Sequence, residues 1–134
     1  MYQVYLYTKN NKNLEVIKNF KLEELACKDP DIKDSQIITL STDLLDHLSQ
    51  FRETYKKPIT VTSCYRTKKW NESKEVKGAT YSQHLFGEAV DFLLPKNKKE
   101  QEEFVNLCEK IFPKIIVSLK DRYIHCAVES KIIK

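Results

Sequence analysis

Hydrophobic and polar residues alternate in several short runs of the chain, a pattern typical of β-strands. Near the start, Tyr2, Val4 and Leu6 occupy every second position. Later runs are rich in β-branched or apolar residues, and the last two flank a tight turn at residues 120–122, which favours an antiparallel hairpin. We therefore predict strands near residues 2–7, 58–65, 87–95, 114–119 and 123–128.

Apolar residues recur at helical spacing in two longer stretches. The first, residues 40–58, has Ser41 or Thr42 as its candidate N-cap. The second, residues 96–112, carries many lysines and glutamates on its polar side, and a shorter amphipathic segment spans residues 19–30. The expected buried faces are Leu44, Leu45, Leu48, Phe51 and Tyr55 in the first helix, and Phe104, Val105, Leu107, Cys108 and Ile111 in the second.

A long polar segment, residues 66–84, shows no hydrophobic period. A loop of this length in a small domain is more often functional than idle. The chain shows no repeat, low-complexity tract or domain boundary. The pattern predicts a single α+β domain over residues 1–134, with helices packed on a mainly antiparallel sheet.

Composition fits a folded domain and narrows the range of partners. Of 134 residues, 41% are hydrophobic and 31% charged, which excludes a disordered chain. The net charge of +4 is scattered without a block of like charges, so a nucleic-acid-binding arm is not expected. No secretory signal and no apolar run of about 18 residues is present, so we expect a protein made in the cytoplasm without a membrane span. We also expect a monomer.

The cysteines Cys27, Cys64, Cys108 and Cys126 lie in apolar segments, with no Cys-x-x-Cys pair. We expect free, buried thiols that behave as small apolar residues. A disulfide or a thiolate-bound metal is the alternative.

Three polar residues lie in or beside apolar runs. Asp91 is in the middle of AVDFLL, where a carboxylate is costly to bury without a partner or a cation. His125 lies in YIHCAV, and His84 ends the long polar segment. Two imidazoles and one carboxylate suit catalytic zinc, because three ligands leave a fourth position open to water. Alternatively, His84 is a loop residue, Asp91 pairs with a lysine or arginine, and His125 is a satisfied core histidine. The third histidine, His47, is expected to be a surface or boundary residue.

The stretches YRTKKWN, KGATYSQHLFGEAVDF and YIHCAV resemble the zinc D-alanyl-D-alanine carboxypeptidase family. That family includes vancomycin-resistance dipeptidases and phage L-alanyl-D-glutamate endolysins. The resemblance runs from about residue 19 to residue 128 and is nearest to the small, often phage-borne branch. It implies a Hedgehog/D-Ala-D-Ala-peptidase-like fold and one zinc ion held by His84, Asp91 and His125. The family pattern Ser-x-His-x-x-Gly-x-Ala-x-Asp is matched by Ser82, His84, Gly87, Ala89 and Asp91.

The resemblance also implies roles around the metal. Arg66 is similar in position to the family arginine that binds the substrate carbonyl or carboxylate, a task that suits a planar guanidinium. A surface salt bridge is the alternative for Arg66. Ser82 is expected to contact the substrate or support a ligand, and Asn71 to hold the loop.

The general base departs from the family pattern. Many relatives carry a carboxylate three residues before the last histidine, and here that position is Arg122. We favour Asp121, one residue earlier, as the catalytic base. Glu88 and Glu129 are further candidates.

The resemblance implies a zinc metallopeptidase that hydrolyses peptide stems of bacterial peptidoglycan. It would be of the D,D-carboxypeptidase or L-alanyl-D-glutamate endopeptidase type, acting at the cell wall after phage lysis or as a virion component. One alternative is a catalytically inactive zinc-binding phage structural or cell-wall-binding module. Another is a metal-free interaction domain.

Overall fold

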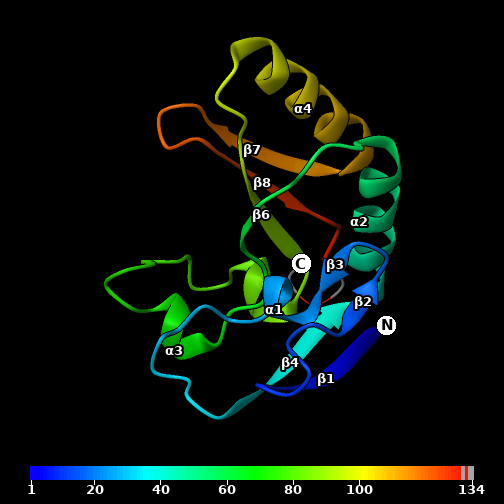
Figure 1. Cartoon of the computed structure of the whole chain (residues 1–134). Helices are drawn as coiled ribbons and strands as arrows, with labels where there is room; N and C mark the ends of the chain where they lie inside the picture. Colours follow the sequence, from blue (N-terminus) through cyan, green and yellow to red (C-terminus); the bar gives the residue numbers. More distant parts are fainter. Residues whose placement is uncertain (131, 133–134) are drawn as a thin grey trace.

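The computed structural model describes residues 1–130 and residue 132 (Figure 1). Its central element is a four-stranded antiparallel sheet in the order β5-β6-β8-β7. Two smaller antiparallel pairs, β1 with β4 and β2 with β3, lie beside it. The predicted α+β class is confirmed. The strands are β1 (Tyr2–Thr8), β2 (Glu15–Ile17), β3 (Phe20–Lys21), β4 (Ser35–Ser41), β5 (Val61–Ser63), β6 (Ala89–Leu93), β7 (Lys114–Ser118) and β8 (Tyr123–Ala127).

Two long helices, α2 (Thr42–Thr54) and α4 (Lys98–Ile111), cover one face of the central sheet. Phe51 of α2 stacks on Phe92 of β6 at a centroid distance of 5.2 Å, and Phe104 of α4 meets Phe92 edge-on at 5.7 Å. Because successive strand residues point to opposite faces, the neighbour of Phe92, Asp91, projects from the uncovered face. Three short helices complete the fold: α1 (Leu22–Leu25), α3 (Lys68–Asn71) and the 3-10 helix η1 (Gln83–Phe86).

Helix α2 begins where the sequence predicts. The Ser41 hydroxyl accepts a hydrogen bond from the backbone N–H of Leu44, which satisfies one of the free donors of the first turn. In α4 the side chain of Asn97 does the same for Glu100. Of the expected apolar face of α4, Phe104 and Cys108 are fully buried, and Val105, Leu107 and Ile111 are partly buried against the core.

Three features differ from the sequence prediction. Strand β4 was not expected, because its alternating residues run directly into the apolar face of α2. Strand β5 is shorter than residues 58–65, since its pairing with β6 is irregular between Val61 and Ser63. The polar segment 66–84 contains α3 and the start of η1.

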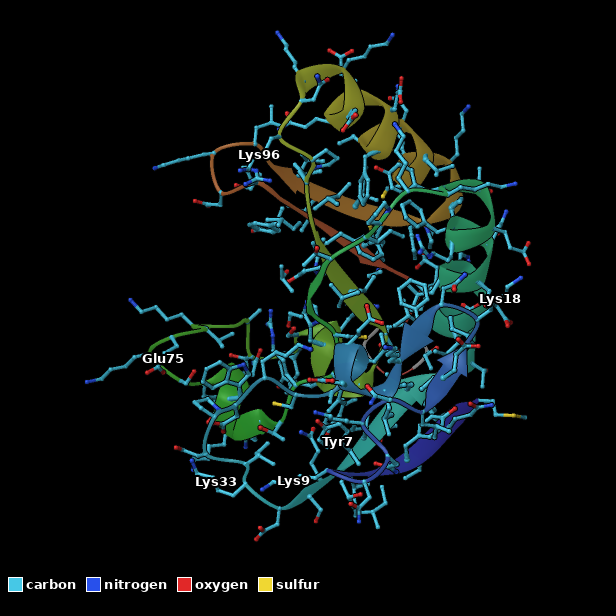
Figure 2. All side chains as sticks on the ribbon, viewed as in Figure 1. Tyr7, Lys9, Lys18, Lys33, Glu75 and Lys96 are labelled. Atoms are coloured by element: carbon cyan, nitrogen blue, oxygen red, sulfur yellow. The ribbon has the colours of Figure 1, made fainter. Side chains whose placement is uncertain are left out.

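The structure can be compared with the predictions for the cysteines and for the distribution of charge. The four cysteines are free and buried, as expected. Lys18 and Lys96 project from other parts of the surface than Lys9 and Lys33, so these lysines do not form one patch (Figure 2). Within the described residues, no helix has the length and apolar character needed to cross a membrane.

The turn between η1 and β6 is held by distant parts of the chain. The Tyr2 hydroxyl donates to Oε2 of the buried Glu88 at 2.8 Å. The backbone N–H of Ser41 donates to the Gly87 carbonyl at 2.9 Å, and that of Val128 donates to the Glu88 carbonyl at 3.1 Å. Strands β1, β4 and the end of β8 therefore all fix this turn.

Candidate metal centre

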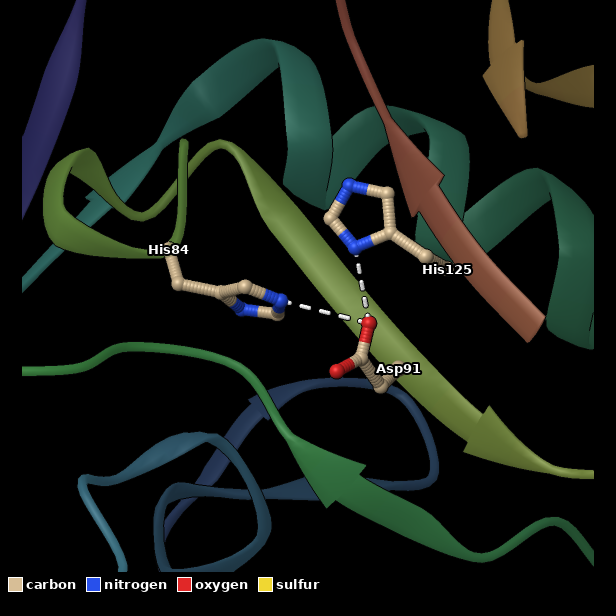
Figure 3. Close-up of side chains that lie close together, drawn as sticks. All are labelled: His84, Asp91 and His125. Atoms are coloured by element: carbon tan, nitrogen blue, oxygen red, sulfur yellow. Dashed lines mark hydrogen bonds and ion pairs between the residues drawn. The ribbon is translucent and has the colours of Figure 1, made fainter. Parts of the chain in front are cut away.

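Three polar side chains converge on the face of the sheet that the long helices leave uncovered (Figure 3). His84 Nε2 lies 3.2 Å from Oδ1 of Asp91, and His125 Nδ1 lies 2.8 Å from the same oxygen. One ligand atom from each residue lies within 4.8 Å of the other two. The structure therefore brings together the three residues that the sequence singled out.

Strand pairing places two of the three side chains. Asp91 of β6 and His125 of β8 are directly opposite in the antiparallel register, so both project from the same face. His84 comes from η1, whose start is fixed by a hydrogen bond from the His84 backbone N–H to the Ser82 hydroxyl. Gly87 ends η1 in the left-handed conformation with φ of 62°, and the chain then turns into β6.

The protonation of His84 follows from its surroundings. Its Nδ1 lies 2.6 Å from the backbone carbonyl oxygen of Cys64. A carbonyl can only accept, so Nδ1 must carry the proton, and in the neutral ring Nε2 presents a lone pair. Burial lowers the pKa of His84, which favours this neutral form, although Asp91 opposes the shift.

The arrangement fits a metal ion. The Nε2 lone pair of neutral His84 faces a carboxylate oxygen of Asp91 at 3.2 Å, so two acceptors point at each other. A cation between them relieves that repulsion. Burial opposes ionisation of Asp91, but its contacts with His125 and His84 together outweigh this, and the pKa of Asp91 lies below its ordinary value. Neutral His84 and ionised Asp91 are thus in the forms that bind a divalent metal, and His125 Nδ1 lies beside the same Asp91 oxygen.

Arg66 supports the Asp91 carboxylate. Its Nη2 lies 3.4 Å from Asp91 Oδ2, its Nε donates to the Ser63 hydroxyl, and its Nη1 donates to the Asn71 side-chain oxygen. Asn71 is buried and donates to the Ala79 carbonyl, so it ties the arginine to the polar segment. A guanidinium has five N–H groups, and these contacts use three of them.

A cleft of about 710 Å³ opens over the three residues. It is lined by the polar segment on one side and the β7–β8 hairpin on the other, and Arg66, Ser82 and Asp121 all line it. The Asp121 carboxylate is exposed, accepts a hydrogen bond from the Ser118 hydroxyl at 3.2 Å, and lies outside the three-residue group. Glu75, which the sequence did not single out, also lines the cleft.

The other candidate bases point elsewhere. Glu88 is buried against Tyr2, and Glu129 is exposed and lies 3.9 Å from Lys114. Neither lines the cleft. Arg122, at the position of the family carboxylate, donates from Nη2 to the Leu94 carbonyl at 2.8 Å.

A comparison with protein families places the chain in a known family. The family profile described as Peptidase M15 matches residues 18–127, most of the chain. The chain belongs to the peptidase M15 family. This is the zinc D-alanyl-D-alanine carboxypeptidase-like family that the motifs resemble, so the resemblance is confirmed. A search of curated proteins found no match.

M15 peptidases are zinc-dependent metallopeptidases, and the donor set of this M15 chain fits that metal. The fixed tautomer of His84 is of the kind that backbone carbonyls impose on zinc-ligating histidines. The Cys64 carbonyl is the partner here, while the Cys64 thiol is buried, which raises its pKa to about 12 and disfavours a thiolate ligand.

The stability of the metal-free M15 chain is expected to fall between pH 7 and pH 5.5. The pKa of His84 is lowered in the folded state, whereas the unfolded chain titrates near 6.5. Below that pH the unfolded state binds a proton that the folded state excludes, so acid favours unfolding, by about 1 kcal/mol over this range. Urea denaturation of the chelated protein at several pH values measures this. A free energy of unfolding that stays constant over the range would contradict the neutral, buried His84.

Proposed function

We propose that this chain hydrolyses peptide bonds in the peptide stems of bacterial peptidoglycan, with one zinc ion held by His84, Asp91 and His125. The observation that carries the proposal is the lone pair of His84 Nε2 directed at Asp91 Oδ1, at the base of a cleft in an M15 chain. A cleft of about 710 Å³ is large enough for a short peptide.

Bound zinc supplies Lewis-acid activation of water and of the substrate carbonyl. Asp91 Oδ1, which faces both histidines, would bind the metal. Asp91 Oδ2 accepts a hydrogen bond from Arg66, which holds the carboxylate in place. The two remaining N–H groups of Arg66 serve the substrate carbonyl or carboxylate, where they stabilise developing negative charge. Ser82, at the start of η1, supports His84 through its backbone contact and lines the same cleft.

Asp121 is our proposed proton acceptor. It lies in the turn of the hairpin whose second strand carries His125, and it lines the cleft. A carboxylate that takes the proton of the attacking water delivers it afterwards to the leaving amine. Asp121→Asn is the direct test, and Glu75→Gln, at the other cleft-lining carboxylate, is its matched control. Loss of turnover in E75Q rather than D121N would assign the base to Glu75.

The proposal is tested on the full chain with purified peptidoglycan. Zinc content by elemental analysis is expected to be one ion per chain. Digestion is expected to release new amino groups, and mass spectrometry of the products identifies the bond. Release of D-alanine indicates a D,D-carboxypeptidase, and a new D-glutamate amine indicates the endopeptidase. Stoichiometric zinc with no released amine would favour the inactive wall-binding module instead.

Arg66→Lys is expected to lower kcat/KM about 100-fold while zinc content stays at the wild-type level. Lysine keeps the positive charge but lacks the planar fork that bonds Ser63, Asn71 and Asp91 together. The measurement is steady-state hydrolysis with zinc content determined on the same sample. Arg52→Lys on α2, whose guanidinium donates a hydrogen bond to the Lys57 carbonyl and does not line the cleft, is the control and is expected to be unchanged.

A further inference from the structure

Two aliphatic side chains and one tyrosine ring lie beside the polar cluster on the same face of the sheet. Ile116 of β7 is directly opposite His125, and Leu93 of β6 is directly opposite Tyr123 of β8. Leu93 lies two residues from Asp91 and Tyr123 two from His125, so strand alternation places them with the metal-site residues. All three line the cleft. We call Leu93, Ile116 and Tyr123 the apolar ledge.

The apolar ledge has no part in the core. The core lies on the other face, where Phe92 and Ile124 are fully buried. Ile116 is 62% exposed and Leu93 is 36% exposed. A single exposed apolar residue needs no explanation, but adjacent ones in a cleft next to reactive groups mark a binding surface.

The opposite side of the cleft has a different chemistry. It is contributed largely by the polar segment and includes Arg66, Ser82 and Gln83, together with Lys28. One wall therefore offers charged and hydrogen-bonding groups to a peptide backbone, while the sheet wall adds the apolar ledge beside the metal centre. A bound peptide gains from both walls when a residue next to the reacting bond turns an aliphatic side chain toward the sheet.

We propose that the apolar ledge binds an aliphatic side chain of the substrate, on a residue that flanks the cleaved bond. This rests on the proposed function, in that the ligand is a peptide cut at the metal centre. Because β7 is an edge strand of the sheet, the ledge is open on that side. Longer unbranched side chains therefore gain contact with Ile116, because no further strand of the described chain lies beyond β7 to block them.

The probe is the stem pentapeptide L-Ala-γ-D-Glu-L-Lys-D-Ala-D-Ala. Each alanine in turn is replaced by glycine, 2-aminobutyrate or norvaline, which gives side chains of zero to three carbons at each position. At one position, each added carbon is expected to improve binding about twofold, because a ledge buries about half of a methylene group. Glycine to norvaline then spans about eightfold.

Two readouts are used. For the zinc-loaded chain, kcat/KM is measured from released amine. For the metal-free chain, which cannot turn over the peptide, Kd is measured from the shift of the isotope-labelled Ile116 methyl resonance. Ile116→Thr and Leu93→Thr are each expected to reduce the difference in affinity between the glycine and norvaline peptides from about eightfold to about twofold or less. Because Ile116→Thr lacks the labelled methyl group, its Kd is measured from another resonance in the cleft. Threonine keeps the β-branched strand preference at position 116. Ile37→Thr on β4 is the matched control, because Ile37 is 64% exposed on another sheet, and it is expected to keep the full range.

The outcomes separate this proposal from the proposed function. A chain-length dependence in Kd that is lost in Ile116→Thr supports the ledge, even if the zinc-loaded chain cuts nothing and the proposed function fails. Hydrolysis that is indifferent to side-chain length, or a dependence that survives in both threonine variants, overturns the ledge and leaves the proposed function standing. Failure of every peptide to bind either form overturns the ledge as well.

Discussion

Replacing His125 with alanine is expected to abolish stoichiometric zinc binding and to lower kcat/KM by on the order of 10³-fold or more, since the reaction depends on the metal. The variant leaves only His84 and Asp91 to hold the ion. Two protein ligands fall short of the three that catalytic zinc sites use. Zinc per chain after dialysis and the rate of amine release from peptidoglycan are the two measurements. Far-ultraviolet circular dichroism checks that the partly exposed position tolerates the change.

The chain offers a matched control for this experiment. His47 lies on α2, where its ring contacts the Asp43 carbonyl, far along the sequence from the metal centre. His47→Ala removes a histidine without touching the cleft and is expected to keep both zinc and activity. Wild-type zinc content in His125→Ala would refute the assignment of the three ligands.

Gly87→Ala is expected to destabilise the fold by roughly 3 kcal/mol or more. A Cβ at Gly87 would lie 2.0 Å from the Thr39 carbonyl oxygen and 2.7 Å from the Leu40 Cα. Both obstacles are backbone atoms of β4, so they cannot rotate away, and φ of +62° adds strain for any other L-residue. Urea denaturation measures the change. Zinc affinity is expected to fall with it, because Gly87 connects the segment of His84 to the strand of Asp91.

Gly78→Ala provides the contrast. There the added Cβ would meet the side-chain oxygen of Asn71 at 1.9 Å, and a side chain can move where a backbone cannot. We expect Gly78→Ala to lower the stability less than Gly87→Ala does. We also expect it to lower turnover, because a displaced Asn71 no longer holds Arg66 in position. Equal stability of the Gly87→Ala variant and the wild type would contradict the close packing of η1 on β4.

The residues of the candidate site could be found from the sequence because each conflicts with its surroundings. A carboxylate within AVDFLL and a histidine within YIHCAV need partners, and the spacing of His84 and Asp91 matches a family motif. Their convergence depends on the pairing of β6 with β8, which alternation alone does not specify. The long helices were predictable because their apolar faces repeat over several turns.

The rest of the site depends on contacts that leave no periodic signal. The network of Arg66 with Ser63 and Asn71 joins the end of strand β5, the loop after it and helix α3. The general base stays a prediction because the direction of Asp121 depends on a hairpin turn with Arg122 at φ of 53°, which residue order does not reveal. The apolar ledge was also missed, since Ile116 resembles any other strand residue until its pairing with His125 is known.

The hydrogen bonds from Tyr2 and Val128 to Glu88 bear on when the chain can fold during its synthesis. Tyr2 and Glu88 are 86 residues apart, and Asp91 and His125 are 34 apart, so these contacts close very long loops. On the ribosome, a growing chain that has exposed β6 still lacks β8 on one side of it. The metal centre therefore takes shape only once β8 has left the exit tunnel and paired with β6.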